Sequence, residues 1–342
     1  MAKLNNITGA LLIDATATFL NGAGLGVQED KNRVIPKTFK EKVNNRLEDV
    51  PYVSAQSWRR WLRDTTNEEN NWKPSELRAV GKGSEKGTTN KIATELNPIE
   101  FPEDDLFGYM KAGAKGEESV QRTSPFKSSI LKGIKNMRTI NIDEAFVHLK
   151  EGTPLPYSTK FYSAHLEGFF NLEYYRLGVY NNLGSKQELS SEMVEKHGSI
   201  LNQSSLGGKF NRYELKNAVE NRNNNASGLL KGLAYLRGGA KQAAFGADVS
   251  PKVLILAGLE SANPIFNNLF IGTGEKPILN VELLLELSKD YKTKLATPIY
   301  VGFRKGYLQN EEEINEKLKD GFVLASPVDI VNQFNKNYLT NG

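Results

Sequence analysis

The chain has 342 residues, no cysteine, and 44 basic against 40 acidic side chains, which gives a formal net charge of +4. This length predicts two domains or one core with large insertions, and the lack of cysteine excludes disulfides, thiolate metal sites and thiol nucleophiles. The densest apolar run, Val253 to Leu259, is far shorter than the roughly 20 residues that span a bilayer, so we expect a cytoplasmic protein without a membrane partner.

The N-terminal third begins with a predicted buried strand, Asn5 to Ala15, followed by a glycine-rich loop, Asn21 to Gly26. Ser54 is a good N-cap for a helix over Ala55 to Arg63. The polar stretch from Lys73 to Asn90 predicts an exposed loop. Beyond it, Asp104 and Asp105 are placed to cap a helical turn.

The middle of the chain carries the clearest periodic pattern. Ser124 to Leu131 predicts a strand, and Lys132 to Lys160 looks irregular. From Tyr162 to Tyr174 apolar and polar residues alternate, which predicts a long strand with one buried face.

The C-terminal half predicts further elements of both kinds. Asn211 to Arg237 contains helical stretches split by an Asn-rich kink at Asn223 to Asn225, and Ser326 with Pro327 suits a helix start. The remaining expected elements are a central strand, a helix, and another strand, over Lys252 to Leu259, Val281 to Tyr291 and Pro298 to Phe303. The main elements follow a split β-α-β order, so we predict an α+β fold with an RNA-recognition-like (ferredoxin-like) core and large insertions.

The charge is unevenly distributed along the chain. Lys111 to Arg138 holds seven basic and two acidic residues, and Ser205 to Lys252 holds eight basic and three acidic ones, so each window carries +5. The remainder of the chain therefore sums to −6. Basic windows broken by glycine suit a polyanion surface, although a solvated surface with chance clustering is the alternative.

Nothing in the sequence argues strongly for catalysis. Gly22, Gly24 and Gly26 do not have the spacing of a dinucleotide-binding loop, and fit a flexible turn or a backbone close to a ligand. A nucleotide-binding enzyme using this loop is a minor alternative. The histidines His148, His165 and His197 lack metal-ligand spacing. We expect no metal, no cofactor and no catalytic residue.

Two segments indicate anion binding. In the helix after Ser54, Arg59 and Arg63 share a face and repel each other unless an anion lies between them, with Arg60 about 100° away. Gln56 and Ser57 in its first turn offer donors where the helix dipole favours phosphate. Trp58 and Trp61 would then face the core or stack on a base. The alternative is an amphipathic helix with a basic outer face.

The second segment is Gly238-Gly239-Ala240-Lys241-Gln242. Two glycines allow close backbone approach, and Lys241 and Gln242 supply a charge and an amide beside them. The alternative is a helix C-cap at one glycine followed by a surface loop.

The ordered set of motifs resembles the DevR or "autoregulator" family, the backbone subunit of type I CRISPR Cascade complexes, closest to subtype I-B. The resemblance spans roughly Asn5 to Phe270 and does not extend to the C-terminal 70 or so residues. It is carried by Leu20-Asn21 with its glycine loop, Pro51 to Arg60, Asp105 to Met110, Arg122 to Pro125, Gly239 to Gln242, and Ser261 to Phe266.

The resemblance implies one right-hand-shaped protein over residues 1–342. The palm would be an RNA-recognition-like core built from about 5–20, 51–65, 104–131, 160–180 and 211–303. The fingers would be an insertion over about 66–103, including Gly81 to Asn90. The thumb would be an insertion over about 132–160.

The family's function implies a non-catalytic subunit that polymerises head-to-tail along the CRISPR RNA spacer and presents bases to a target DNA strand, beside other Cascade subunits. Contacts with RNA phosphates would then come from Gln56, Ser57, Arg59, Arg60, Arg63, Lys241 and Gln242. Asn21, Gly22 and Gly24 would lie beside the RNA, and Met110 would be an apolar wedge. The alternative is a type III-like subunit that cleaves target RNA with a metal at Asp30.

Overall fold

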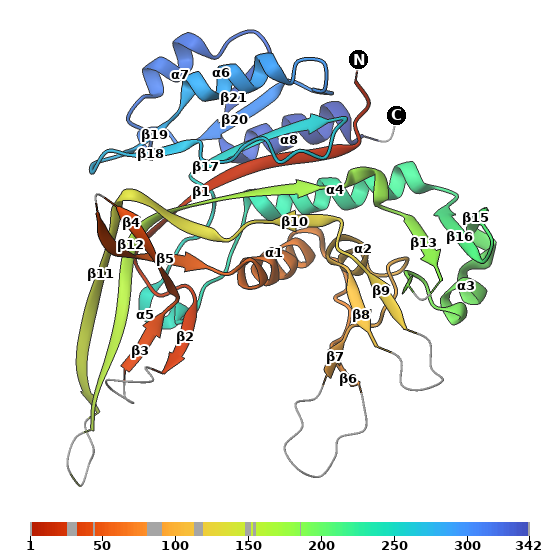
Figure 1. Cartoon of the computed structure of the whole chain (residues 1–342), viewed down its shortest axis with the longest axis horizontal. Helices are drawn as coiled ribbons and strands as arrows, with labels where there is room; N and C mark the ends of the chain where they lie inside the picture. The colour runs from red at the N-terminus through yellow and green to blue at the C-terminus, as the bar shows by residue number, and fades with distance from the viewer. Residues whose placement is uncertain are drawn as a thin grey trace.

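The protein has mixed α+β architecture in the computed structural model, which describes residues 2–25, 33–43, 45–80, 91–112, 119–147, 152, 155–184 and 186–340. Figure 1 shows a body with two lobes that project from its lower side. The predicted α+β class is confirmed. None of the helices in the described ranges is long and apolar enough to cross a membrane.

The body is built on a sheet of eleven strands. Its main path runs β21 (Phe322–Ala325), β20 (Ile299–Phe303), β17 (Val253–Leu259), β1 (Asn6–Thr18), β12 (Leu155–Leu172), β11 (Leu131–Val147), β5 (Arg46–Val53) and β4 (Thr38–Val43). β10 (Phe126–Ser128), β2 (Gly22–Leu25) and β3 (Arg33–Pro36) pair beside this path. At its centre β17, β1, β12 and β10 form an antiparallel group in that order.

The predicted alternation along β12 is confirmed, but the expectation of a single buried face is wrong, because a second core covers the other face, where Glu167 and Asn171 are buried. Tyr162, Leu166 and Phe170 are fully buried on one face, in a core that also contains Leu11 and Leu254 from the neighbouring strands. The odd-numbered residues of this stretch, such as Glu167 and Phe169, lie on the opposite face. Period-two patterning is therefore what separates the two cores of the body.

The two faces of this eleven-stranded sheet are covered by different helices. α1 (Ala55–Asn70), α4 (Ala218–Ala234) and α8 (Pro327–Tyr338) contribute buried side chains to the first core. α6 (Val281–Asp290), α7 (Glu311–Lys317) and the hairpin of β18 (Phe270–Gly272) with β19 (Pro277–Leu279) contribute to the second. As predicted, Ser326 caps α8 by accepting a hydrogen bond from the Asp329 amide.

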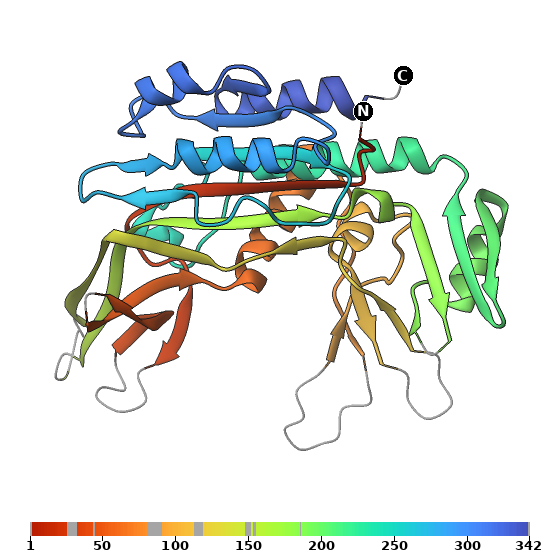
Figure 2. The ribbon, with the colours of Figure 1, turned by 45° about the horizontal axis from the view of Figure 1, so that its top comes forward.

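The two lobes flank the underside of the body (Figure 2). The hairpin lobe consists of β2 to β5 and the far ends of β11 and β12, with α5 (Gln242–Phe245) at its base. The sheet lobe contains α2 (Pro102–Phe107), α3 (Ser191–His197), β6 (Arg78–Val80), β7 (Lys91–Ala93), β8 (Tyr109–Lys111), β9 (Val120–Arg122), β13 (Val179–Leu183), β14 (Lys186–Gln187), β15 (Leu201–Gly207) and β16 (Phe210–Leu215), with short 3₁₀ turns at Tyr174–Arg176 and Gly198–Ile200.

Several local predictions are wrong. The segment from Lys132 to Lys160 is not irregular, because most of it forms the long hairpin of β11 and β12. The glycine loop is a strand over Gly22–Leu25, paired with β3. The helix after Ser54 continues to Asn70. In the C-terminal half, Phe210–Leu215 is a strand, and α4 runs unbroken through its asparagines.

Asp104 and Asp105 do not cap α2. The helix starts at Pro102, and both aspartates lie inside it, fully buried. The guanidinium of Arg122, also buried, lies 2.5 Å from Asp105 and 3.1 Å from Glu188. These residues tie α2 to the sheet lobe, and burial raises the pKa of Asp105 despite the nearby cation.

Candidate nucleic-acid interface

Three segments far apart in sequence meet on the underside of the body: the end of β1, the start of α1, and the turn over residues 238–242. The Asn21 Oδ1 accepts a hydrogen bond of 3.0 Å from the Ser54 amide, directly at the N-cap of α1. The Ala240 amide donates to the Leu20 carbonyl at 3.0 Å. The structure therefore brings together the segments that the sequence singled out separately.

Glycine is required in the turn for steric reasons. Gly238 has φ of +153° and Gly239 has φ of +109°, a region that side chains disfavour. A Cβ at Gly238 would overlap the ring of Trp61 on α1, and one at Gly239 would press on Leu20. The two glycines thus let the turn lie directly on α1 and on the end of β1.

The start of α1 has the features of an anion-binding helix end. The Ser54 Oγ accepts from the Ser57 amide at 3.3 Å, and no acidic residue lies in the first turn. The earliest amides of a helix have no intrahelical partner, and the helix dipole is positive there. With Gln56 exposed beside them, these groups suit a phosphate or carboxylate.

Lys241 contributes a cation at the same place. It adopts a left-handed conformation with φ of +51°. Its Nζ donates to Thr159 Oγ1 at 2.9 Å and lies 5.2 Å from the centroid of the Phe19 ring. Neither partner carries a charge, so the ammonium remains available to an anion while its position is fixed.

Gln242 makes contacts within the turn itself. Its side-chain amide donates to the Gly238 carbonyl and, at 3.2 Å, to the Ala247 carbonyl. The amide therefore holds the turn and its short helix α5 in shape. Beside it the half-buried rings of Phe161 and Phe245 lie 5.9 Å apart, between centroids.

The helix α2 supplies carboxylates to Arg63 but only a backbone carbonyl to Arg59, so the predicted anion between the two arginines is not found among the described contacts. Two nitrogens of Arg63 each lie 2.8 Å from a Glu103 oxygen, and Nη2 lies 3.5 Å from Asp104. Arg59 donates to the carbonyl of Phe107, the last residue of α2, at 3.3 Å, and burial lowers the pKa of Arg59. Both arginines therefore dock α2 on α1, and Arg63 is not part of the exposed surface.

Arg60 is the exposed arginine of this helix. Its Nε lies 2.8 Å from Asp64 one turn later, with both side chains about half exposed, so this pair is weak and easily replaced. Trp58 is fully buried and donates from Nε1 to the Ser129 carbonyl at 2.7 Å. Trp58 was predicted either to lie in the core or to stack on a base, and its place in the core is confirmed.

The other predicted site residues lie elsewhere. Gly22 and Gly24 belong to β2, next to Asn21 in sequence and paired with Pro36 and Ile35. Met110 is exposed but lies on β8 in the sheet lobe, away from the turn over residues 238–242. Asp30, like Gly26 and the segment from Gly81 to Asn90, lies outside the described residues.

Sequence reasoning missed Lys37 and Thr159. The Lys37 amide donates to the Asn21 carbonyl at 2.8 Å, which places a further lysine next to the site, and Thr159 orients Lys241 from β12. No local pattern marks either residue. The pairing of β2 with β3, at Gly22 and Pro36, places Lys37 beside Asn21, and the pairing of β3 with β12, at Val34 and Thr159, adds Thr159 to the same sheet.

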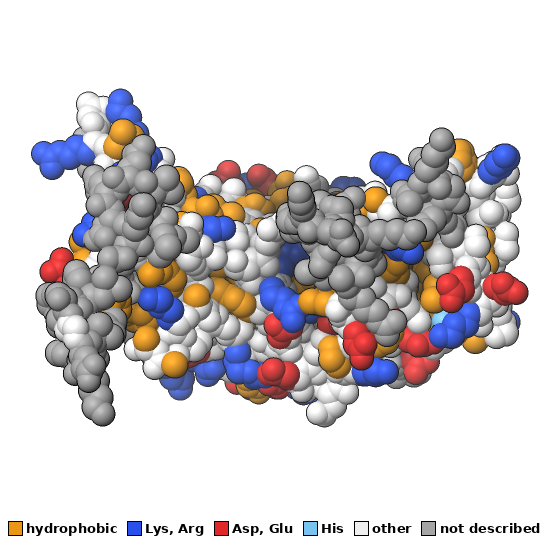
Figure 3. Space-filling model, turned by 90° about the horizontal axis from the view of Figure 1, so that it is seen from below, with side chains coloured by type: hydrophobic (Ala, Val, Ile, Leu, Met, Phe, Trp, Pro, Cys, Tyr) orange, Lys and Arg blue, Asp and Glu red, His pale blue; other side chains and the backbone are white. Residues whose placement is uncertain are grey.

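The basic windows do not map onto one groove. In the first, Arg122, Lys127, Lys132 and Arg138 all pair with carboxylates. In the second, ion pairs involve Arg212, Arg222, Lys231, Arg237 and Lys252. Accordingly, the underside between the lobes carries a mixture of basic, acidic and apolar side chains (Figure 3). Lys241 differs from these paired cations in having uncharged partners, a property that it shares with Lys216, which donates to the Ser199 carbonyl.

His148 lies outside the described residues, and within them no group of three or more His, Asp or Glu side chains could hold an ion. The Nδ1 of His165 lies 2.6 Å from the Tyr307 hydroxyl. Burial lowers the pKa of His165. The Nε2 of His197 lies 3.5 Å from Glu100. Both histidines pack structurally at these contacts.

Comparison with known proteins assigns the chain to a family. No curated protein matches the sequence. Two solved structures are similar in fold: a "CRISPR RNA-guided surveillance complex" (TM-score 0.53, 11% identity, 97% of this chain and 98% of that one), and a "CRISPR RNA-guided surveillance complex, pre-nicking" (TM-score 0.56, 10% identity, 97% and 99%). The family model described as "CRISPR-associated negative auto-regulator DevR/Csa2" matches residues 20–291. The chain is a member of the DevR/Csa2 family of CRISPR-associated proteins.

Proposed function

We propose that this protein is the non-catalytic backbone subunit of a type I CRISPR Cascade complex, with I-B as the expected subtype. It binds the phosphates of the CRISPR RNA spacer without reading their sequence. The observation that carries the proposal is the meeting of the α1 N-terminus, Asn21 and Lys241 at one place, in a member of this family. The surveillance complexes that share its fold support the same role.

The contacts proposed for the RNA are of the sequence-independent kind. Backbone amides at the start of α1, Gln56, Ser57, Arg60 and Lys241 would meet phosphate oxygens. Asn21, Gly22 and Gly24 would lie alongside the strand, and Gln242 would hold the turn. Such contacts fix register but carry no sequence information. A subunit that serves any guide requires this property, because base pairing then reads the target.

The fold supports a division into palm, thumb and fingers. The strand order β17-β1-β12-β10, with α1 and α4 on one face, is compatible with an RNA-recognition-like sheet. We assign the palm to this group. The thumb would be the hairpin of β11 and β12 beyond the sheet, and the fingers would include β6 and β7. Met110 would act as a wedge from the lobe opposite the thumb.

The partners follow from this role. Copies of the subunit would bind head-to-tail along the CRISPR RNA, since a heterologous interface need not close into a ring. Target DNA would pair with the exposed guide bases, and the other Cascade subunits would bind the ends of the assembly. Target cleavage would belong to a separate protein.

The test is RNA binding by the purified protein with its neighbouring subunits. We expect co-purified RNA of discrete guide length, and an affinity that falls steeply with salt as counterions are released. The double variant Arg60→Ala/Lys241→Ala should weaken binding similarly for unrelated guide sequences. RNA binding that is absent, independent of salt, or weakened for one sequence only would reject the proposal.

A further inference from the structure

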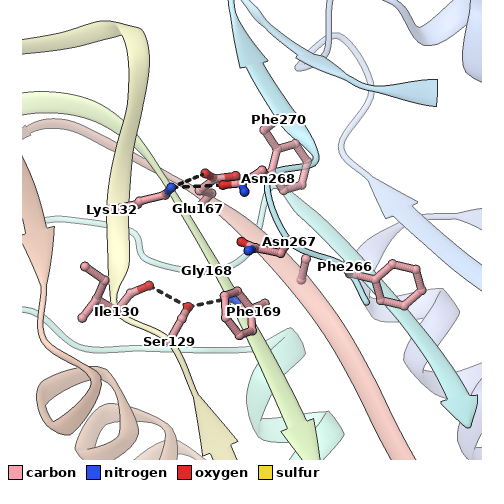
Figure 4. Close-up of a pocket in the computed structure, with 11 residues that line it drawn as sticks. Ser129, Ile130, Lys132, Glu167, Gly168, Phe169, Phe266, Asn267, Asn268 and Phe270 are labelled. Atoms are coloured by element: carbon pink, nitrogen blue, oxygen red, sulfur yellow. Dashed lines mark hydrogen bonds and ion pairs between the residues drawn. The ribbon is translucent and has the colours of Figure 1, made fainter. Parts of the chain in front are cut away.

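A cavity of about 260 Å³ lies on the face of the central sheet opposite α1 and α4. Its floor is formed by β1 and β12, one wall by the segment from Ser129 to Lys132, and the other by the segment from Phe266 to Phe270. In Figure 4, Lys132, Glu167 and Asn268 gather at one side, Ser129 and Phe169 lie at the other, and Asn267 lies between them. None of these residues belongs to the surface around Lys241.

The sequence builds this cavity with two unusual positions. A Cβ at Gly168 would lie 2.5 Å from Leu131 Cδ2 and 3.3 Å from the Ile130 carbonyl oxygen, so only glycine lets that wall rest on the floor. Asn268 is held in the left-handed region with φ of +56°. That conformation turns its amide oxygen toward Lys132, where it accepts a hydrogen bond of 3.1 Å.

The polar side of the cavity offers a donor directly beside an acceptor. Lys132 Nζ lies 3.4 Å from Glu167 Oε1, a loose ion pair, and the Glu167 side chain is only 11% exposed. Burial raises the pKa of Glu167, although Lys132 and the Phe270 amide oppose that shift. A carboxylate has about four lone-pair sites, so Glu167 can accept further hydrogen bonds from a ligand.

The apolar side offers aromatic surface and a second compartment. Phe169 is half-buried, whereas Phe266 and Phe270 form buried parts of the wall. A neighbouring hollow of about 190 Å³ shares Ser129 and Phe169 with the first cavity. It is also lined by Asn171, which is 4% exposed and whose Oδ1 is a buried acceptor without a hydrogen-bond partner among the described residues.

We propose that this cavity binds a nucleobase, with guanine preferred, stacked on Phe169 and read at its edge by Glu167 and Lys132. Guanine presents two N–H donors next to a carbonyl oxygen. The donors would bind the Glu167 carboxylate, and the carbonyl would accept from Lys132, as charged side chains do when they read bases. The ring would stack on Phe169.

Size and charge restrict the ligand to the base. An apolar cavity of about 150 Å³ holds benzene, so a cavity of about 260 Å³ has room for a bicyclic ring. Drug-sized ligands occupy roughly 300–1,000 Å³, which argues against a complete nucleotide inside. Both cations at the cavities, Lys132 and Lys127, are paired with glutamates, so no phosphate is expected here.

The proposal goes beyond RNA-backbone binding, and its test is independent of it. Saturation-transfer NMR on the full-length protein would compare the binding of guanosine, cytidine, adenosine and uridine in competition with one another. We expect guanosine to bind best, because uracil offers one donor between two carbonyl oxygens that a carboxylate repels. A guanine within a short single-stranded oligonucleotide, UGU against UUU, would distinguish a strand as the source from a free nucleoside.

Two variants and one control make the test specific. Glu167→Gln should weaken guanosine binding roughly tenfold to a hundredfold, the range of a charged hydrogen bond, and Phe169→Leu should weaken it about tenfold through lost stacking. Glu260→Gln removes an exposed glutamate outside the cavity, paired only with Lys294 at 3.7 Å, and should leave guanosine binding unchanged. Guide RNA binding should persist in all three.

Three results would overturn the proposal. They are no signal from any nucleoside with the folded wild-type protein, uridine binding as well as guanosine, and equal loss of binding in the Glu260→Gln control. Saturation by acetyl-arginine amide, with no nucleoside bound, would instead identify the cavity as a docking site for a protein side chain and reject the nucleobase.

Discussion

The replacement Lys241→Met is the sharpest test of how the protein binds RNA. Methionine retains the apolar stem over the Phe19 ring but removes the ammonium, whose partners are a hydroxyl at 2.9 Å and a ring at 5.2 Å. No carboxylate is released by the change at these contacts. Any loss of RNA affinity therefore reports a direct interaction between the ammonium and the RNA.

The expected magnitude follows from one lost phosphate contact. For single-stranded nucleic acid, the slope of log K against log salt changes by about 0.7 per neutralised phosphate. We expect the slope for Lys241→Met to be shallower by about that amount, with an affinity lowered by roughly tenfold at low salt, or about 1.4 kcal/mol. Filter binding of a guide-length RNA at several salt concentrations would measure both quantities.

Lys252→Met is the matched control. It removes the same charge from the same basic window, but the Lys252 Nζ is already 2.5 Å from Asp248 and its side chain is 20% exposed. We expect little change in the slope. Equal changes in the two variants would refute the reasoning, because binding would then depend on net charge rather than on the position of Lys241.

Three further predictions concern stability. Trp58→Phe loses the hydrogen bond to the Ser129 carbonyl and should lower the free energy of unfolding by about 2 kcal/mol, measured by urea denaturation. The salt dependence of RNA binding should stay unchanged. Gly238→Ala should cost about 1–3 kcal/mol through overlap with Trp61, more than Gly246→Ala, which shares a positive φ but has no atom within 4 Å of the added Cβ. Burial alone would raise the pKa of Glu103, but Arg63 outweighs it and holds the pKa below the usual value. The wild type should therefore have its largest stability advantage over Glu103→Gln above the pKa of Glu103 in the unfolded chain, about 4.3. This advantage should decrease as the pH falls through the lower pKa of Glu103 in the folded protein. An unchanged difference at acid pH would contradict that ion pair.

Local sequence patterns correctly predicted those helices and strands whose formation depends on residues close together in the chain. The alternation in β12, the apolar run of β17 and the Ser326 cap of α8 are all confirmed. Each is determined by side chains within a few residues of one another. The sequence therefore located the main sheet and one of its helices before any tertiary information.

The errors occur where distant residues supply the stabilising partner. Two of the three asparagines predicted to break α4 are buried and paired across the fold: Asn225 donates to Asp105 at 2.9 Å, and Asn223 accepts from the Tyr174 hydroxyl at 2.6 Å. These contacts replace the local hydrogen bonds through which asparagine usually disfavours helices.

The candidate interface could be predicted only in part, because some of its residues have partners that lie far away in the sequence. Gln56, Ser57, Arg60 and Lys241 stand out by residue type beside glycine or a helix start, and the structure gathers their segments. The partners of Arg63 come from α2, forty residues away, and no spacing rule reveals them. Summing charge over a window likewise cannot distinguish a cation paired with a carboxylate from one held by a hydroxyl.

The buried guanidinium of Arg122 has a consequence for folding. It donates to the carbonyls of Asp105, Val179 and Arg176 and is paired with the Asp105 and Glu188 carboxylates. A state in which one of these segments was undocked would leave a buried charge incompletely compensated, which costs several kcal/mol. Partly assembled forms of the sheet lobe are therefore disfavoured, and α2, β9, β13 and β14 should become ordered in one cooperative step.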